Sequence, residues 1–197
     1  MESVLRVLGV VAVVTCLAVL AAKHPPAWLR DEVHAARVAH DPWARYVAPD
    51  SVCPGRDRTD LSVLAQDRVM VCLLAYARRS AGLPALPVVY RLNRSSLLKA
   101  IDITTCADFS HTACGRPFTS VFEAVGYAGW TGENIAWAAG LDGAPASIVS
   151  GWLNSRHHRD NLFSREWAEQ GIALVPAPSF LGRARAQIWV NEFGNPT

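Results

Sequence analysis

The stretch that determines the architecture of this chain is residues 109–161, FSHTACGRPFTSVFEAVGYAGWTGENIAWAAGLDGAPASIVSGWLNSRHHRDN. It contains three polar pieces, FSHT, GENIA and HRDN, in a setting rich in aromatic residues. We expect these pieces to converge on one site that contains His111, Glu133 and His158. Two imidazoles and a carboxylate are the groups from which a metal site or an acid/base pair is built.

Composition limits the classes of protein to which the chain can belong. With 197 residues, 51% of them hydrophobic, it can form one domain with a substantial core and an N-terminal appendage. Its 19 basic and 17 acidic residues are interspersed and give a net charge of only +2. This pattern lacks the basic stripe typical of nucleic-acid-binding proteins, so no nucleic-acid partner is expected.

The N-terminus begins with an apolar run, because residues 7–22 contain no charged side chain. The run exceeds a typical signal-peptide core of about 7–15 residues and falls short of the roughly 20 that span a bilayer. Residues 1–24 are therefore predicted to form a hydrophobic helix that is either a cleaved signal peptide or an uncleaved membrane anchor. Both alternatives predict an exported, extracellular or cell-surface protein, and residues 25–66 are expected to form a connector.

Four cysteines follow the apolar run: Cys53, Cys72, Cys106 and Cys114. An even number in an exported chain predicts two disulfides, although sequence alone leaves three connectivities open. A Cys106–Cys114 pair would fix the short loop that contains His111. Cys53 would then tie the N-terminal extension to a helix that contains Cys72.

Apolar spacing predicts a chain in which helices precede strands. Helices are expected from about residue 61 to Gly82, from residue 93 or 95 onward, over 118–125, and from about 144 onward. Strands are expected at 171–175 and 187–193, joined by a hairpin-type connection at 176–185. This order predicts an α+β domain with a mostly antiparallel sheet.

Several motifs follow one another in an order that can be compared with a known family. They are RRSAGLPAL (78–86), FSHT (109–112), GY (126–127), GENIA (132–136), WLNS (152–155), HRDNL (158–162), GIA (171–173) and Trp189 with FG (193–194). This order resembles a CAP (SCP-like, cysteine-rich secretory protein family) domain of the bacterial type. The resemblance implies a CAP domain at 67–197, folded as a three-layer α-β-α sandwich with a central antiparallel sheet.

The resemblance also implies a cavity, which in this family usually has two His and two acidic residues. The matching positions here are His111, Glu133 and His158. The second acidic position of animal relatives corresponds to Asn154 and Ser155, which lack a carboxylate. The sequence therefore predicts three of the four cavity residues.

The chemistry of these three residues admits a metal-binding and a purely structural interpretation. His111 and His158 could bind a divalent metal such as zinc weakly, since structural zinc sites normally use four protein ligands. Glu133 would then be the catalytic base or would orient an imidazole. In the structural interpretation, Glu133 caps a helix at residues 134–136, and the two imidazoles only hold local turns.

Two functions follow as hypotheses. The first is an extracellular binding module for an apolar ligand, such as a lipid, or for a cell-envelope partner, as the resemblance implies. The second is a metal-assisted hydrolase that uses His111, His158 and Glu133. We favour the binding module, because the second acidic residue is missing.

Overall fold

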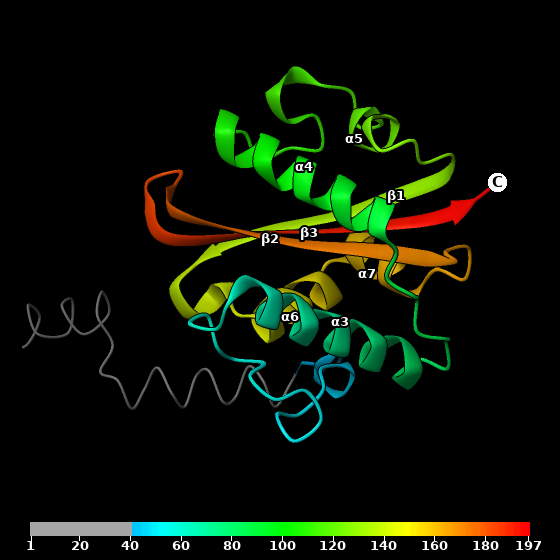
Figure 1. The fold of residues 1–197 in the computed structure, drawn as a ribbon. Coiled ribbons are helices and arrows are strands. Elements are labelled where there is room, and N and C mark those ends of the chain that lie inside the picture. Colours follow the sequence, from blue (N-terminus) through cyan, green and yellow to red (C-terminus); the bar gives the residue numbers. More distant parts are fainter. Residues whose placement is uncertain (1–40) are drawn as a thin grey trace, which may run out of the picture. The chain divides into compact units, whose positions relative to one another are not determined.

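The centre of the structure is a three-stranded antiparallel sheet (Figure 1). The computed structural model describes residues 41–197, of which Arg45–Thr197 forms one compact unit. β3 lies between the other two strands, and the strands are β1 (Gly129–Ala139), β2 (Glu169–Phe180) and β3 (Arg183–Pro196). The predicted α+β class with an antiparallel sheet is confirmed.

Helices cover both faces of the sheet (Figure 1). One face carries α4 (Tyr90–Cys106) and α5 (Ser120–Ala124). The other carries α3 (Val63–Ser80), α6 (Pro145–Asn154) and α7 (Arg156–Phe163). Three short 3-10 turns complete the described elements: Ala44–Tyr46, Ala113–Gly115 and Gly140–Gly143.

The first long helix, α3, begins and ends at the signals in its sequence. The Ser62 hydroxyl accepts a hydrogen bond from the Ala65 amide and caps the helix start. At the other end Gly82 adopts a positive φ of 71°, which favours glycine, and Pro84 follows. Leu73, Leu74 and Ala77 are buried beneath this helix.

The sheet differs from the sequence prediction in two places. β1 was not predicted, and the helix that Glu133 was expected to cap at residues 134–136 is a strand instead. The hairpin predicted between the last two strands is present, but the connection is much shorter than residues 176–185, since β2 and β3 continue toward each other. Only Leu181 and Gly182 separate them, both with positive φ, which suits a tight hairpin between twisted strands.

The helices also differ from expectation. α4 begins at Tyr90, before the predicted Asn93 or Ser95, and its N-cap residue, Val89, makes no side-chain cap. The side-chain oxygen Oδ1 of Asn93 instead accepts a hydrogen bond from the Ile172 amide on β2, at 2.8 Å. α7 was not predicted because Leu162 is its one buried residue, which leaves no apolar periodicity to detect.

The hydrophobic core consists of two parts, one on each face of the sheet. Beneath α4, one cluster packs Ala100 and Ile103 against Ile135, Ile188 and Val190. On the opposite face, Trp152 and Trp189 are almost fully buried. The sheet is therefore a rigid support between two apolar layers.

The N-terminal expectations fall largely outside the described residues. This holds for the hydrophobic helix expected at 1–24 and for the first part of the connector expected at 25–66. The compact unit begins at Arg45, within that connector. Within residues 41–197, no helix combines the length and apolar character that a membrane crossing requires.

Candidate functional site

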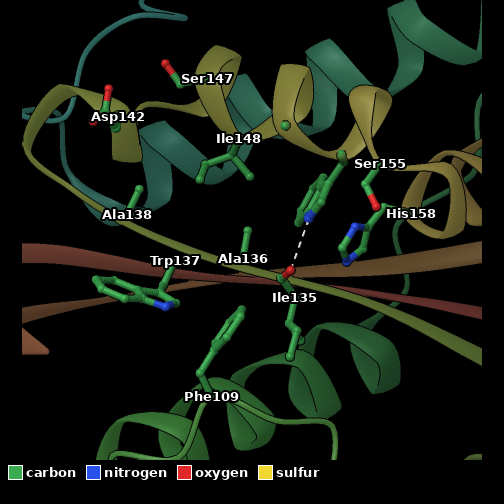
Figure 2. A pocket seen from close by; sticks show the side chains of 12 residues that line it. Phe109, Ile135, Ala136, Trp137, Ala138, Asp142, Ser147, Ile148, Ser155 and His158 are labelled. Atoms are coloured by element: carbon green, nitrogen blue, oxygen red, sulfur yellow. Dashed lines mark hydrogen bonds between the residues drawn. The ribbon is translucent and has the colours of Figure 1, made fainter. Parts of the chain in front are cut away.

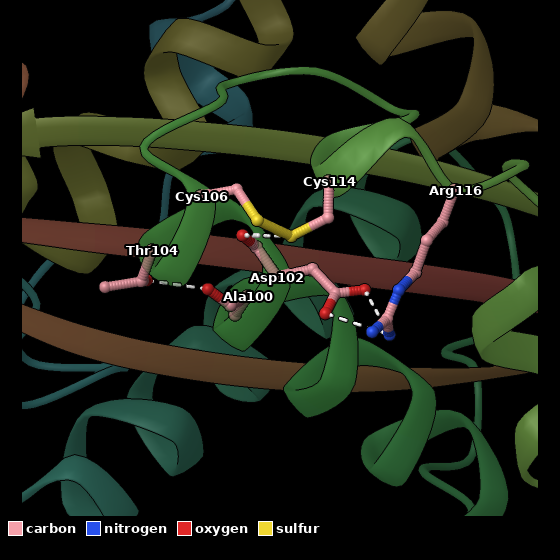
Figure 3. The surroundings of a disulfide bond; sticks show 6 residues. All are labelled: Ala100, Asp102, Thr104, Cys106, Cys114 and Arg116. Atoms are coloured by element: carbon pink, nitrogen blue, oxygen red, sulfur yellow. Dashed lines mark hydrogen bonds and ion pairs between the residues drawn. A yellow bond between two sulfur atoms is a disulfide. The ribbon is translucent and has the colours of Figure 1, made fainter.

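The loop that carries His111 is held at both ends. A disulfide joins Cys106, the last residue of α4, to Cys114, eight residues later (Figure 3). Close to it, an Arg116 Nη1 atom lies 3.2 Å from a carboxylate oxygen of Asp102. The loop is thus fixed to α4 by a covalent bond and an ion pair.

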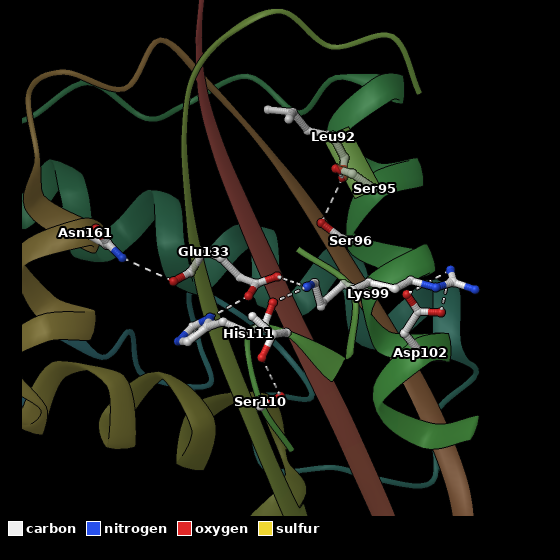
Figure 4. Close-up of polar contacts among 11 residues, drawn as sticks. Leu92, Ser95, Ser96, Lys99, Asp102, Ser110, His111, Glu133 and Asn161 are labelled. Carbon is white, nitrogen blue, oxygen red and sulfur yellow. Dashed lines mark hydrogen bonds and ion pairs between the residues drawn. The ribbon is translucent and has the colours of Figure 1, made fainter. Parts of the chain in front are cut away.

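His111 contacts Glu133 directly. Its Nδ1 atom lies 2.5 Å from Glu133 Oε1, and the Glu133 side chain is fully buried, whereas that of His111 is 53% exposed (Figure 4). Lys99 Nζ donates to the His111 carbonyl at 2.5 Å and lies 4.0 Å from Glu133 Oε2. The predicted pair of His111 and Glu133 is therefore brought together, with a buried lysine behind it.

A second carboxyl lies beside Glu133, on the neighbouring strand. Glu192 of β3 is paired with Glu133 of β1, and it is completely buried. Burial raises the pKa of Glu192 well above its usual range, and the adjacent Glu133 carboxylate adds to the rise. Glu192 was not among the predicted site residues, because the second acidic position was expected near Asn154 and Ser155.

His158 is placed by a network of amides. Asn134 Nδ2 donates to the His158 carbonyl at 3.0 Å, and Asn161 Nδ2 donates to Asn134 Oδ1 at 3.0 Å and to the Glu133 carbonyl at 3.2 Å. Burial lowers the pKa of His158, and the nearby imidazoles of His111 and His157 lower it further. The ring is therefore neutral at pH 7. Its Nδ1 atom is buried and has no hydrogen-bond partner within the described residues.

Within residues 41–197, no three His, Cys, Asp or Glu side chains come together in a ligand cluster. His111 Nδ1 is also engaged by Glu133. Weak zinc binding by His111 and His158, and a catalytic role for Glu133, stay predictions.

A cleft of about 380 Å³ runs along β1 beside His158 (Figure 2). α6 forms one wall and the Phe109 loop the other. Trp152 is one of its lining residues, and its Nε1 atom donates to the Ile135 carbonyl at 3.2 Å. The residues that line it are mostly apolar: Phe109, Ile135, Ala136, Trp137, Ala138, Asp142, Ser147, Ile148, Gly151, Trp152, Ser155 and His158.

The other two cysteines of the described residues are Cys53, in the segment before α3, and Cys72, within α3. Cys53 is bonded to Cys72, across 19 residues of chain. The expectation of two disulfides is confirmed, and the structure contains the connectivity in which one bond fixes the His111 loop and the other ties the segment before α3 to that helix.

Comparison with known proteins places these features in a family. Residues 71–193 match the CAP family, described as the cysteine-rich secretory protein family. The uncharacterised protein YkwD of Bacillus subtilis (strain 168) is 29% identical over 135 residues, which cover 67% of this chain and 48% of YkwD. The chain thus spans about half the length of this relative.

Two solved structures share the fold. One is an outer surface protein of Borrelia burgdorferi, with a TM-score of 0.56 and 20% identity over 66% of this chain and 92% of that protein. The other is an extracellular protein of Bacillus anthracis that contains an SCP domain, with a TM-score of 0.58 and 18% identity over 76% of this chain and 44% of the other. Because the family match extends from residue 71 to residue 193 of 197, this chain belongs to the CAP, or cysteine-rich secretory protein, family.

Proposed function

We propose that the protein is an extracellular binding module whose cleft takes an apolar ligand, such as the acyl chain of a cell-envelope lipid. The lining of the cleft is the observation that carries this proposal. Ile148 lines the cleft on the α6 side of β1, and Phe109 and Trp137 line it on the other side of that strand (Figure 2); Trp152 is also among the lining residues. Its volume of about 380 Å³ lies within the range of about 300–1,000 Å³ that is usual for small-molecule sites.

The polar residues at the cleft suit an orienting role for an apolar molecule. No lysine or arginine is among the residues that line it, and His158, being neutral, adds no positive charge. Ser155 and His158 stand together at one end (Figure 2). An uncharged polar group of the ligand would find hydrogen-bonding partners there, while its apolar part would contact the aromatic walls.

An extracellular location is supported by two observations. Two disulfides in one small domain are typical of proteins that fold in an oxidising compartment. The related folds include a protein described as an outer surface protein and another described as extracellular. The N-terminal signal or anchor predicted from residues 1–24 would provide the route of export.

The binding proposal can be tested at Gly151, a helical residue that lines the cleft. A Cβ atom added there meets no other atom within 4 Å, so Gly151→Leu fills the cleft without a clash at the backbone. Removing a glycine from a helix also stabilises it by about 0.5–1 kcal/mol. We expect at least a tenfold loss of affinity for the neutral fluorescent probe N-phenyl-1-naphthylamine, at equal or higher thermal stability.

Gly151→Ala is the matched control, because it gives the same gain in helix propensity but adds only one carbon to the cleft. We expect it to bind the probe within about threefold of the wild type. If Gly151→Leu binds the probe as well as Gly151→Ala does, the cleft is not the apolar site. If the wild type does not bind the probe, the proposed ligand class is wrong.

A further inference from the structure

Behind His111 lies a charged cluster that the proposed ligand does not touch. It consists of Glu133 on β1, Glu192 on β3 and Lys99 on α4, and the side chains of all three are buried. Residues paired directly across an antiparallel sheet point to the same face, so both carboxyls project toward α4, where Lys99 lies. Two acids therefore share one buried cation.

The contacts of the two carboxyls are unequal. Glu133 has His111 Nδ1 at 2.5 Å from Oε1 and Lys99 Nζ at 4.0 Å from Oε2. Neither Glu192 oxygen has a hydrogen-bond partner within the described residues, and the same is true of Glu133 Oε2. The residue paired with Glu192 on β2 is Gly171, which has no side chain to offer.

Two adjacent buried carboxylates cannot both remain charged at low cost. If one carries a proton, its hydroxyl can donate to the other and satisfy an orphaned oxygen on each. The charged member is Glu133, because Lys99 Nζ and the Nδ1 atom of His111, which can donate a proton in a hydrogen bond, both face it. The neutral member is then Glu192, and the cluster of Lys99, Glu133 and Glu192 carries no net charge.

We propose that Glu192 is a neutral carboxylic acid that donates its proton to Glu133 Oε2, and that it acts as a positioning residue for His111. Glu133, with a single negative charge, then accepts the Nδ1 proton of His111. The imidazole is held in the tautomer that has its free Nε2 as a hydrogen-bond acceptor. The raised pKa of Glu192 agrees with this arrangement. The role holds whether or not the cleft binds an apolar molecule.

The protonated acid has a direct signature in infrared spectroscopy. We expect the full-length protein at about pH 8, above the pKa of about 7 of the half-buried Asp67, to show the C=O band of a carboxylic acid. The band should shift when glutamate carrying ¹³C in its side-chain carboxyl is incorporated, which separates it from any aspartic acid. It should vanish in Glu192→Gln and persist in Glu166→Gln, an exposed control. Absence of the band from the wild type would overturn the proposal, as would its persistence in Glu192→Gln.

The positioning role requires a second measurement, the ¹⁵N shifts of the His111 ring. We expect the wild type to show the tautomer protonated at Nδ1. Glu192→Gln should keep it, because the Gln amide can also donate to Glu133. Glu192→Leu offers no donor to Glu133 Oε2, so the hydrogen bond between Glu133 and His111 should change and the ¹⁵N shifts of the ring should move away from the wild-type pattern. If Glu192→Leu leaves the ring unchanged, or if Glu192→Gln alters it as much, Glu192 does not position His111.

Discussion

At the scale of single residues, Asp67 is a half-buried acid that lies away from the candidate site. It is on α3, beside β2, and one of its oxygens is buried without a hydrogen-bond partner within the described residues. Burial raises the pKa of Asp67 to about 7, although a backbone interaction with Leu174 partly opposes the shift. This carboxyl therefore titrates in the physiological range.

The raised pKa predicts how stability depends on pH. The folded-state pKa lies above the unfolded value of about 3.9, so the folded protein binds this proton more tightly. The associated stability is fully present below about pH 4 and is lost as the pH rises to about 7. Allowing for partial exposure of the group, we expect a loss on the order of 2 kcal/mol.

Urea unfolding at a series of pH values checks this expectation. Asp67→Asn should make the decline between about pH 4 and pH 7 smaller by about this amount, and it should be more stable than the wild type at pH 7; the part of the decline that comes from Glu192, whose pKa is also raised, should remain. Asp57→Asn, at an exposed position, should keep the wild-type profile. A decline of the same size in Asp67→Asn would show that other groups cause it.

Site residues that lie in a short sequence motif could be predicted from the sequence. Site residues that join the site only through contacts of the folded chain could not. His111, Glu133 and His158 each lie in a short polar motif, and the structure brings His111 to Glu133. Glu192 and Lys99 have no such signal. Lys99 resembles any surface lysine of a helix, and Glu192 resembles an outward strand residue, until the register of β1 and β3 pairs it with Glu133.

At the scale of elements, the Cys106–Cys114 loop links the disulfide to the proposed cleft. The loop carries Phe109, which forms one wall of the cleft, and His111, which contacts Glu133. The disulfide closes only a short loop, which corresponds to about 2.6 kcal/mol in the chain-entropy treatment. Its removal should thus affect both stability and the shape of the cleft.

The two disulfides should have separable effects. We expect Cys106→Ala combined with Cys114→Ala to lower stability by about 2–3 kcal/mol and to weaken N-phenyl-1-naphthylamine binding several-fold. Cys53→Ala combined with Cys72→Ala opens a longer loop and should cost about 3 kcal/mol, with probe affinity unchanged. Thermal unfolding and fluorescence titration measure the two quantities. Equal losses of affinity in both double variants would contradict a specific role for the His111 loop.

Elements could be predicted where periodicity and caps agree. α3 has both, and its end at Gly82 was predicted. β1 has neither, because residues 129–139 are rich in glycine and alanine and lack the β-branched alternation of a typical strand. Pairing with β3 along its whole length makes it a strand, and that pairing is a long-range contact which local sequence does not reveal.

At the scale of the whole molecule, the helices cover the two edges of the sheet with side-chain hydrogen bonds. On β1, Trp152 and Asn161 donate to the backbone carbonyls of Ile135 and Glu133. On β2, the Asn93 side chain accepts from the Ile172 amide. Covered edges disfavour the addition of further strands, so a three-stranded sheet can be stable without closing into a barrel.

Arg78 links two helices of the same layer, α3 and α7. The residue is buried near the end of α3, and its guanidinium donates to three carbonyls. Nε donates to Pro84 at 2.8 Å, and Nη1 donates to Leu162 at 2.8 Å and to Ser164 at 3.0 Å. The side chain therefore joins the end of α3 to the end of α7, which carries His158 at its start.

Replacement of Arg78 should weaken the whole fold. In Arg78→Met the three carbonyls lose a charged donor, and hydrogen bonds to charged groups contribute about 1.5–3 kcal/mol each. We expect the free energy of unfolding in urea to fall by at least about 3 kcal/mol in Arg78→Met. The loss should be smaller in Arg78→Lys, because the single ammonium group of lysine cannot reproduce all the hydrogen bonds of the guanidinium. Arg79→Met, at the exposed neighbouring position, should stay within about 0.5 kcal/mol of the wild type. If Arg78→Met is no less stable than Arg79→Met, α3 and α7 are held together by apolar packing alone.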